Sequence, residues 1–399
     1  MKTLIFEGKV LKVGLIQVCS KFTKKAYHAC FSPVRFKTVK DDSLPNSNWV
    51  KVKNIQSGIC GTDLTFYTCK QGPSTALYPM PCSDVTYLGH ETVGIVEQIG
   101  EDVSNLKVGD RVILHEYMSC CDIKNIDRCD NCKNGDYAIC ENYGVDSTIT
   151  QTLGAGMGDY YYAHKNQLLK IDDNISNDQA VLIEPFAVSL HAVLKHIPNP
   201  GEKVLVVGAG MIGLGIIQML KIFQPNCKVY VMERDVVKQQ FALKLGADEI
   251  VKGNAYEAVA KCTDAKLYKK GNNIMLIGGF DSIFDTVGKG SLLNDTLRWV
   301  KARGTIVKVG YQMTKTKFDE TPLWWQEVNI IGVDSHGMEN YNGKKQSSFE
   351  MVIDLMNQNK LTTNGFITHH FKLTDYKKAF KLLIERTEPA IKVVLDCEV

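Results

Sequence analysis

Cys60 and His90 are residues of types that bind zinc in proteins. Cys60 lies in GICGTDL (58–64), and His90 follows thirty residues later in GHETVG (89–94). A catalytic zinc takes three protein ligands and leaves a fourth position open for water or substrate. Taken singly, a cysteine such as Cys60 is more often a buried thiol than a ligand, and a histidine such as His90 is more often a hydrogen-bonded structural side chain. Together they predict a catalytic metal site if the rest of the chain supplies a matching context.

A second group of cysteines has the spacing of an incomplete structural zinc site. Cys129, Cys132 and Cys140 fall in CDNCKNGDYAIC (129–140), but a closed zinc site takes four ligands. The segment just upstream supplies Cys120 and Cys121. We prefer Cys121 as the fourth ligand, because its shorter loop costs slightly less closure entropy. A neighbouring aspartate is a weaker candidate, and a cysteine-rich loop without metal is the alternative.

The run GAGMIG predicts a site for a dinucleotide. It sets Gly208, Gly210 and Gly213 in GxGxxG spacing between a strand-like VLVV and a helix-like LGIIQML. The first glycine permits a tight turn, the second lets pyrophosphate approach the backbone, and the third lets the helix pack closely. The uncharged run 204–220 touches the lower length limit of a membrane helix, but its glycines favour the strand, turn and helix.

Three charged residues after the next expected strand bear on the choice of cofactor. Glu233, twenty residues beyond Gly213, can accept both ribose hydroxyls and would repel a 2′-phosphate. Arg234 beside it can pair with that phosphate, and Lys238 can assist either cofactor. We therefore expect NAD and keep NADP open.

Composition narrows the class of protein. The 399 residues include 47 Lys plus Arg and 44 Asp plus Glu, so the net charge is only +3. We expect neither nucleic acid nor a membrane as a partner. Thirteen cysteines, an odd number in a large chain, indicate metal ligands and free thiols in a reducing compartment, which we take to be the cytoplasm. We expect the segment MKTLIFEGKVLKVGLIQ to form a strand pair rather than a signal peptide.

The order of elements predicts an α/β protein with two domains. Up to about residue 185, short β-rich segments alternate with turns. From about 200, apolar strands alternate with helix-like stretches, as in a parallel sheet covered by helices. We expect a β-rich catalytic domain over 1–186, completed by 338–399, and a doubly wound dinucleotide-binding domain over 187–337.

Six motifs give the chain a specific resemblance. GICGTD, GHE, GDRV (109–112), the cysteine group, LIEPFAVSLHAV (182–193) and GAGMIG occur in the order found in zinc-dependent medium-chain dehydrogenases, the alcohol, sorbitol and threonine dehydrogenase superfamily. The resemblance runs from about residue 30 to the end. It implies a GroES-like catalytic domain, a Rossmann cofactor domain and hydride transfer between an alcohol or polyol-like substrate, or its ketone, and NAD(P). The extra N-terminal residues and PLWWQEVNIIG (322–332) look like a less familiar branch.

The resemblance also assigns roles to individual residues. Cys60 and His90 become ligands of the catalytic zinc, and Glu184 looks like the third ligand of the polyol and threonine type. Glu91 approaches the metal in some relatives, so an exchange between Glu91 and Glu184 stays open. Asp63 looks like the carboxylate that orients His90. The structural zinc of the family takes four cysteines.

The expected proton relay begins at Thr62, whose position two residues after Cys60 matches the family's relay threonine. Many relatives carry a histidine three residues later, where this chain has Thr65, so the resemblance does not identify the next residue of the proton relay. Phe66, Tyr67, Tyr87 and Tyr143 are aromatic residues that could line a substrate pocket.

Two alternatives keep the fold but change the function. One is a zinc-independent, quinone-reductase-like enzyme, and the other is a non-catalytic nucleotide-binding zinc protein. By resemblance, the chain forms a homodimer or homotetramer paired through strands of the cofactor domain, with VNIIGVDS (328–335) as the edge strand.

Overall fold

The chain folds into two compact units. The computed structural model describes residues 1–39, 43–71, 75, 85–115, 127–142 and 154–397. The first unit contains residues 1–184 and 363–399, and the second contains 185–362. Residues 338–362, which we expected to complete the catalytic domain, make their contacts within the second unit instead.

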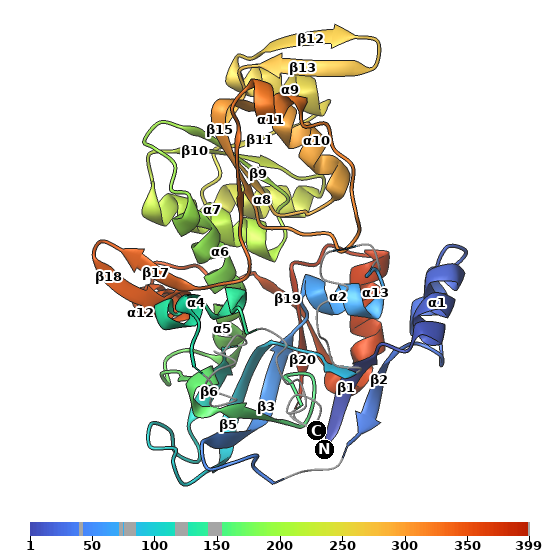
Figure 1. Cartoon of the computed structure of the whole chain (residues 1–399), viewed down its shortest axis with the longest axis vertical. Helices are drawn as coiled ribbons and strands as arrows, with labels where there is room; N and C mark the ends of the chain where they lie inside the picture. Colours follow the sequence, from blue (N-terminus) through green and yellow to red (C-terminus); the bar gives the residue numbers. More distant parts are fainter. Residues whose placement is uncertain (40–42, 72–74, 76–84, 116–126, 143–153, 398–399) are drawn as a thin grey trace. The chain divides into compact units, whose positions relative to one another are not determined.

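A sheet of seven strands forms the centre of the first unit (Figure 1). Its order is β19-β20-β3-β5-β6-β8, and β7 also pairs with β3. Alternating burial along the longer strands places Val50 and Val52 of β3 in an apolar core with Val96 of β5. The strands are β3 (Trp49–Gly58), β5 (Glu91–Ile99), β6 (Arg111–Leu114), β7 (Tyr160–His164), β8 (Leu168–Lys170), β19 (Ile367–Lys372) and β20 (Lys392–Asp396).

The N-terminal segment differs from the expected strand pair. A second sheet of three strands has the order β2-β1-β4, from β1 (Lys2–Glu7), β2 (Val34–Thr38) and β4 (Val85–Tyr87). Between β1 and β2 the chain forms helix α1 (Val10–Cys19) and the 3-10 helix η1 (Lys24–His28). The prediction of a second strand was wrong, because residues 10–19 form a helix that buries Ile16. A helix brings only one residue in three or four to the core, whereas a strand would bury every second residue.

The other helices of the first unit are short. They are α2 (Gly61–Tyr67), α4 (Asp130–Asn134), α5 (Asn177–Val181) and α13 (Tyr376–Glu385), together with 3-10 turns η2 (Tyr137–Ile139), η4 (Lys165–Gln167) and η5 (Leu373–Asp375). Helix α13 buries Tyr376, Ala379 and Phe380 against the core beneath α2. Helix α6 (Ile183–Lys195) begins at the end of this unit and continues into the second.

The second unit is built on a parallel sheet of six strands with the order β11-β10-β9-β14-β15-β16. The strand order reverses between β9 and β14, and dinucleotides bind at such a switch point. The strands are β9 (Lys203–Val207), β10 (Lys228–Met232), β11 (Glu249–Ile250), β14 (Phe280–Asp285), β15 (Val300–Lys308) and β16 (Asn329–Gly332).

Helices and two hairpins complete the second unit. The helices are α7 (Met211–Phe223), α8 (Val236–Lys244), α9 (Ala255–Thr263), α10 (Gly290–Trp299), α11 (Thr321–Trp325) and α12 (Ser348–Asn357). One hairpin, β12 (Lys266–Lys270) with β13 (Asn273–Ile277), stands away from the sheet (Figure 1). The other joins β17 (Met338–Tyr341) to β18 (Lys344–Ser347). The uncharged run 204–220 is divided between β9, the glycine turn and α7, and in the described residues no helix has the length and apolarity to span a bilayer.

Candidate active site

Three potential metal ligands converge in the first unit. One ligand atom from each of Cys60, His90 and Glu91 lies within 4.8 Å of the other two. Glu91 is buried, whereas Cys60 and His90 are partly exposed. A thiolate, an imidazole and a carboxylate form a donor set that suits zinc, and three protein ligands leave one position free for chemistry. The residues present therefore fit a catalytic zinc ion.

The positions of these ligands follow from how two strands begin and end. Strand β3 ends at Gly58, and Cys60 then caps the N-terminus of α2. Glu91 is the first residue of β5 and pairs with Gly58 across the sheet. A Cβ atom on Gly58 would lie 2.1 Å from Oε2 of Glu91. Only glycine leaves room at this position for the Glu91 carboxylate.

Asp63 fixes the backbone beside two of the ligands. Its Oδ2 accepts a hydrogen bond from the Cys60 amide at 2.9 Å, and its Oδ1 accepts one from the Gly89 amide at 3.3 Å. Burial raises the pKa of Asp63, and the nearby charge of His90 opposes that rise. Asp63 therefore acts through the backbone on both sides of the cluster, and its charge also interacts with that of His90.

Lys392 is a buried cation at the edge of this cluster. Its Nζ contacts Oε1 of Glu91 at 2.5 Å and also contacts Oε2, and it donates to the carbonyl of Ile59 at 3.4 Å. Burial alone would lower the pKa of Lys392, but the negative charges of Glu91, Cys60 and Glu184 raise it. The lysine therefore remains charged and offsets the excess negative charge of the ligands.

Glu184, the predicted third ligand, does not belong to the converging triplet. It is buried in the first turn of α6, and its negative charge helps to raise the pKa of Lys392. Glu91, which we kept as the exchange partner, occupies the place beside Cys60 and His90. Glu91 lies in the cluster because β3 pairs with β5, and this pairing places Glu91 opposite Gly58.

Thr62 lies next to the metal-binding position. Its Oγ1 is 3.7 Å from Sγ of Cys60, within the first turn of α2. Thr65 donates its hydroxyl to the carbonyl of Gly61 at 3.0 Å, so it is engaged with its own helix. Two of the aromatic residues suggested for a pocket are structural instead: Phe66 contacts Phe6, and Tyr67 is stacked on Phe380. Tyr143 lies outside the described residues.

Cys129, Cys132 and Cys140 also converge, with their sulfur atoms within 4.8 Å of one another. Cys129 caps α4, and hydrogen bonds from the amides of Cys132 and Glu141 lower its pKa to about 7. A lowered thiol pKa favours the thiolate that binds metal. The predicted fourth ligands, Cys120 and Cys121, lie outside the described residues.

The glycine turn between β9 and α7 has the three properties expected of a dinucleotide site. Gly208 has a φ of +92°, which favours glycine. A Cβ atom on Gly210 would meet nothing within 4 Å, so the backbone there is open to a phosphate group. A Cβ atom on Gly213 would lie 2.0 Å from the carbonyl oxygen of Gly208, so this glycine permits close packing of the helix on the turn. These residues fit a dinucleotide.

Glu233 lies beside that turn at the end of β10. Its Oε2 accepts a hydrogen bond from the Ala209 amide at 2.9 Å, and its Oε1 accepts from the Arg234 and Asp235 amides at 2.6 and 3.0 Å. The carboxylate is therefore held beside the glycine turn. The Arg234 side chain is exposed, and Lys238 is in the first turns of α8.

Two family models match the chain. The alcohol dehydrogenase GroES-like domain matches residues 46–173, and the zinc-binding dehydrogenase domain matches residues 212–358. The chain belongs to the zinc-dependent medium-chain dehydrogenase superfamily. It is an oxidoreductase that uses zinc and NAD(P) and acts on CH–OH groups, and nothing supports the metal-independent or non-catalytic alternatives.

Two curated relatives align with most of this dehydrogenase. D-arabinitol dehydrogenase 1 of Uromyces fabae is 27% identical, in an alignment that covers 89% of this chain and 92% of the relative. L-idonate 5-dehydrogenase of Vitis vinifera is 27% identical, with 87% of each chain covered. Among solved structures, 2R,3R-butanediol dehydrogenase from Bacillus subtilis superposes with a TM-score of 0.70 at 24% identity, over 92% of this chain and 96% of the other.

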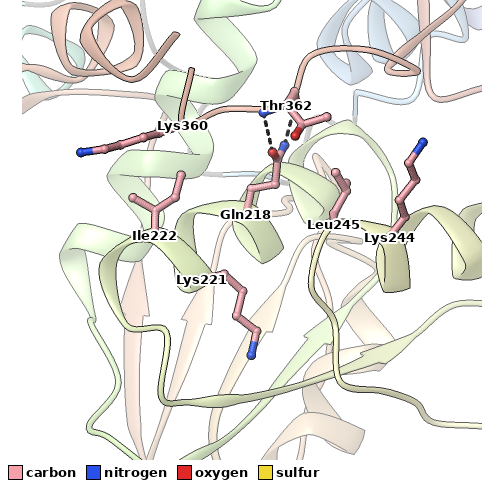
Figure 2. A pocket seen from close by; sticks show the side chains of 7 residues that line it. All are labelled: Gln218, Lys221, Ile222, Lys244, Leu245, Lys360 and Thr362. Atoms are coloured by element: carbon pink, nitrogen blue, oxygen red, sulfur yellow. Dashed lines mark hydrogen bonds between the residues drawn. The ribbon is translucent and has the colours of Figure 1, made fainter. Parts of the chain in front are cut away.

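Figure 2 shows a hollow on the dehydrogenase's second unit that is unlike an active site. The amide of Gln218 exchanges hydrogen bonds of 3.1 and 2.9 Å with the backbone of Thr362. The ammonium groups of Lys221, Lys244 and Lys360 point away from one another (Figure 2). Because these charges do not converge, the hollow provides no binding point for an anion.

Lys392 is the functional residue that sequence reasoning missed. The signal was present, because a lone lysine interrupts the apolar strand AIKVVLD (390–396). A lysine in a buried strand needs a partner of opposite charge. That partner, Glu91, is 301 residues away in sequence, and no local pattern identifies it.

Proposed function

We propose that this dehydrogenase interconverts a polyol and its ketose, with zinc held by Cys60, His90 and Glu91. The convergence of these three ligand atoms within 4.8 Å carries the proposal. The relatives named for D-arabinitol, L-idonate and sorbitol act on polyhydroxylated compounds, which favours that substrate class over simple alcohols.

Each residue of the site has a distinct part in the chemistry. Bound zinc lowers the pKa of a substrate hydroxyl, and bound NAD accepts the hydride. Cys60, His90 and Glu91 hold the metal, and Asp63 fixes the backbone from which Cys60 and His90 project. Thr62 is the first station of the proton relay: its hydroxyl would accept the proton that the substrate hydroxyl loses and pass its own proton on to water. Lys392 offsets the negative charge of Glu91 and orients its carboxylate. Glu184 adds negative charge close to Lys392. It is the alternative to Glu91 as the third zinc ligand.

NAD is the preferred cofactor in this proposal. The Glu233 carboxylate accepts the Ala209 amide and so lies beside the glycine turn, where it repels a 2′-phosphate. Arg234, which would have to pair with the 2′-phosphate of NADP, is exposed.

The remaining proposals concern the assembly and its setting. Cys129, Cys132 and Cys140, with Cys121 or Cys120, hold a structural zinc ion. The chain forms a dimer or tetramer through β16, which in the part of the chain that the structure describes pairs only with β15. Free thiols among the described cysteines fit the reducing cytoplasm.

NAD reduction by the purified protein tests the proposed function. D-arabinitol, xylitol, sorbitol and L-idonate are compared with ethanol and butanediol, before and after treatment with a strong chelator. We expect turnover with polyols, its loss on chelation and its return with added zinc. Thr62→Ala should lower kcat by about 10²-fold or more while Thr62→Ser retains it, because only serine keeps the hydroxyl. Turnover that survives complete zinc removal contradicts the proposal.

A further inference from the structure

Helix α1 presents an apolar stripe to solvent. Leu11, Leu15 and Val18 follow at intervals of four and three residues, so they share one face of the helix. They are 83%, 50% and 57% exposed, and Val10 and Phe22 at the two ends are 84% and 86% exposed. Single exposed apolar residues are ordinary, but five gathered on one segment mark an interaction surface.

The opposite face of α1 anchors it to the first unit. Ile16 is fully buried in the core that also contains Tyr67 and Phe380. The amide of Gln17 donates to the carbonyls of Cys69 and Gln71 at 2.9 and 3.3 Å. The helix, at the margin of this unit in Figure 1, is therefore held in place, and its apolar outer face is a fixed feature.

The segment around α1 is strongly basic. Residues 8–39 contain no Asp or Glu and seven basic residues: Lys9, Lys12, Lys21, Lys24, Lys25, Arg35 and Lys37. Three of these bind Glu7, the acid that precedes the segment: Lys12, Arg35 and Lys37. Within the described part of the chain, no ion pair is found for Lys9, Lys21 or Lys25, and all three are exposed. The near-zero net charge of the whole chain conceals this local excess.

Catalysis does not account for the segment. Residues 1–45 lie outside both family matches, which cover 46–173 and 212–358. The proposed metal ligands and the glycine turn also lie outside residues 8–39. The binding partner that matches an exposed apolar stripe bordered by lysines has an apolar interior and a negatively charged surface.

We propose that α1 docks this dehydrogenase onto the surface of an anionic lipid bilayer. Leu11, Leu15, Val18 and Phe22 enter the boundary between headgroups and acyl chains, while Lys9, Lys21 and Lys25 contact lipid phosphates and carboxylates. A second copy of the chain is a poorer partner. Pairing by a two-fold axis would bring the same lysines together without a matching acid. The proposal revises the expectation, drawn from net charge, that no membrane is involved.

Vesicle co-sedimentation tests this directly. The full-length protein is mixed with vesicles of phosphatidylcholine alone and with vesicles in which about a third of the lipid is phosphatidylserine. We expect binding to the anionic vesicles, at least about tenfold weaker binding to the neutral ones, and loss of binding as salt is raised. Equal binding to both kinds of vesicle, or to neither at low salt, overturns the proposal.

A matched pair of variants separates the α1 stripe from general surface apolarity. Leu11→Gln/Leu15→Gln should reduce the partition onto anionic vesicles by about tenfold or more, because two apolar side chains no longer enter the bilayer. Val108→Gln/Leu243→Gln alters two exposed apolar residues elsewhere, 60% and 45% exposed, and should bind as the wild type does. Both variants should retain NAD-dependent turnover, which shows that they fold.

A charge variant and a measurement of mass complete the test. Lys21→Gln/Lys25→Gln keeps the apolar stripe and should weaken binding only to anionic vesicles, which provides a second route if the leucine variant fails to fold. Light scattering reports oligomeric mass in the absence of lipid. If Leu11→Gln/Leu15→Gln lowers that mass and leaves vesicle binding unchanged, the stripe joins two copies of the chain and the lipid proposal is wrong.

Discussion

At the scale of single residues, Glu91 takes part in two interactions that compete for its charge. It lies within 4.8 Å of Cys60 and His90, and both of its oxygens contact Lys392. The glycine at position 58 makes room for it, since a Cβ atom there would lie 2.1 Å from Oε2. The ammonium group of Lys392 therefore offsets the charge of this buried carboxylate and fixes its orientation.

Removing the cation tests how much the buried pair matters. In the zinc-free protein, Lys392→Met should lower the free energy of unfolding by about 3–5 kcal/mol, because it leaves Glu91 buried without a positive partner. Lys392→Arg should retain most of the stability. The matched control is Lys344→Met, whose pair with Asp354 is exposed at 3.6 Å and should cost at most about 1 kcal/mol. Urea titration measures all three variants, and equal losses for Lys392→Met and Lys344→Met would show that the Glu91 pair is not stabilising.

Glu7 makes the stability of the N-terminal sheet depend on pH. Burial alone would raise its pKa, but hydrogen bonds from Arg35 and Lys12 lower it from 4.5 to about 2. A lowered folded-state pKa gives stability that is present above pH 4.5 and lost as pH falls toward 2. Glu7→Gln should therefore cost about 2 kcal/mol at neutral pH, allowing for the exposure of Arg35, and less at pH 3. Urea titrations at the two pH values check this, and a cost that is independent of pH would contradict it.

At the scale of elements, the β9–turn–α7 unit contains two glycines with different roles, one that leaves space for a phosphate and one that allows close packing. Gly210 faces open space with a φ of −77°, so alanine there fits the fold but occupies the place of a phosphate. Gly213 faces the Gly208 carbonyl at 2.0 Å, so alanine there forces the helix away from the turn.

These two glycines should give opposite results. Gly210→Ala should leave the melting temperature unchanged and raise the KM for NAD by about tenfold or more. Gly213→Ala should lower the free energy of unfolding by about 1–3 kcal/mol. Calorimetry and initial rates distinguish the two effects, and a loss of stability from Gly210→Ala would mean that the position serves packing rather than cofactor binding.

The elements that the sequence predicts well are those with local signals. The strand before Gly208, the turn and the helix after it occur where GxGxxG implies, and Glu233 lies beside them. Cys60 and His90 meet because each motif fixes its own strand end. The pairing of Glu91 with Lys392 joins strands from opposite ends of the chain, and periodicity contains no information about that register. Helix α1 was missed because both of its faces are apolar, which removes the expected alternation.

At the scale of the whole molecule, β16 is the edge strand of the sheet in the second unit. Among the described residues it pairs only with β15, and exposed apolar residues lie on it and just before it: Ile330 is 39% exposed, and Trp324 is 79% exposed. An uncovered edge of this kind is a template for pairing with a second chain. The proposed dimer therefore uses β16, which is in the second unit, whereas the proposed lipid contact uses α1, which is in the first unit.

Charge at that edge should prevent association. Ile330→Arg combined with Trp324→Arg should convert the oligomer into a 44.5 kDa monomer, because two arginines from each chain would face one another across the interface. Tyr268→Arg on β12 changes another exposed aromatic residue and should leave the mass unchanged. Sedimentation velocity measures the mass, and an oligomer that survives the double variant is built on another surface.

The position of the catalytic metal is tested most directly by anomalous diffraction at the zinc edge from crystals of the purified protein. We predict a peak in the first unit bonded to Sγ of Cys60, a ring nitrogen of His90 and a carboxylate oxygen of Glu91, within about 2.0–2.3 Å of each. A second peak should lie among Cys129, Cys132 and Cys140. A peak bonded to Cys60, His90 and Glu184, with Glu91 bound only to Lys392, would contradict the ligand set, and no peak near Cys60 would contradict the proposed chemistry.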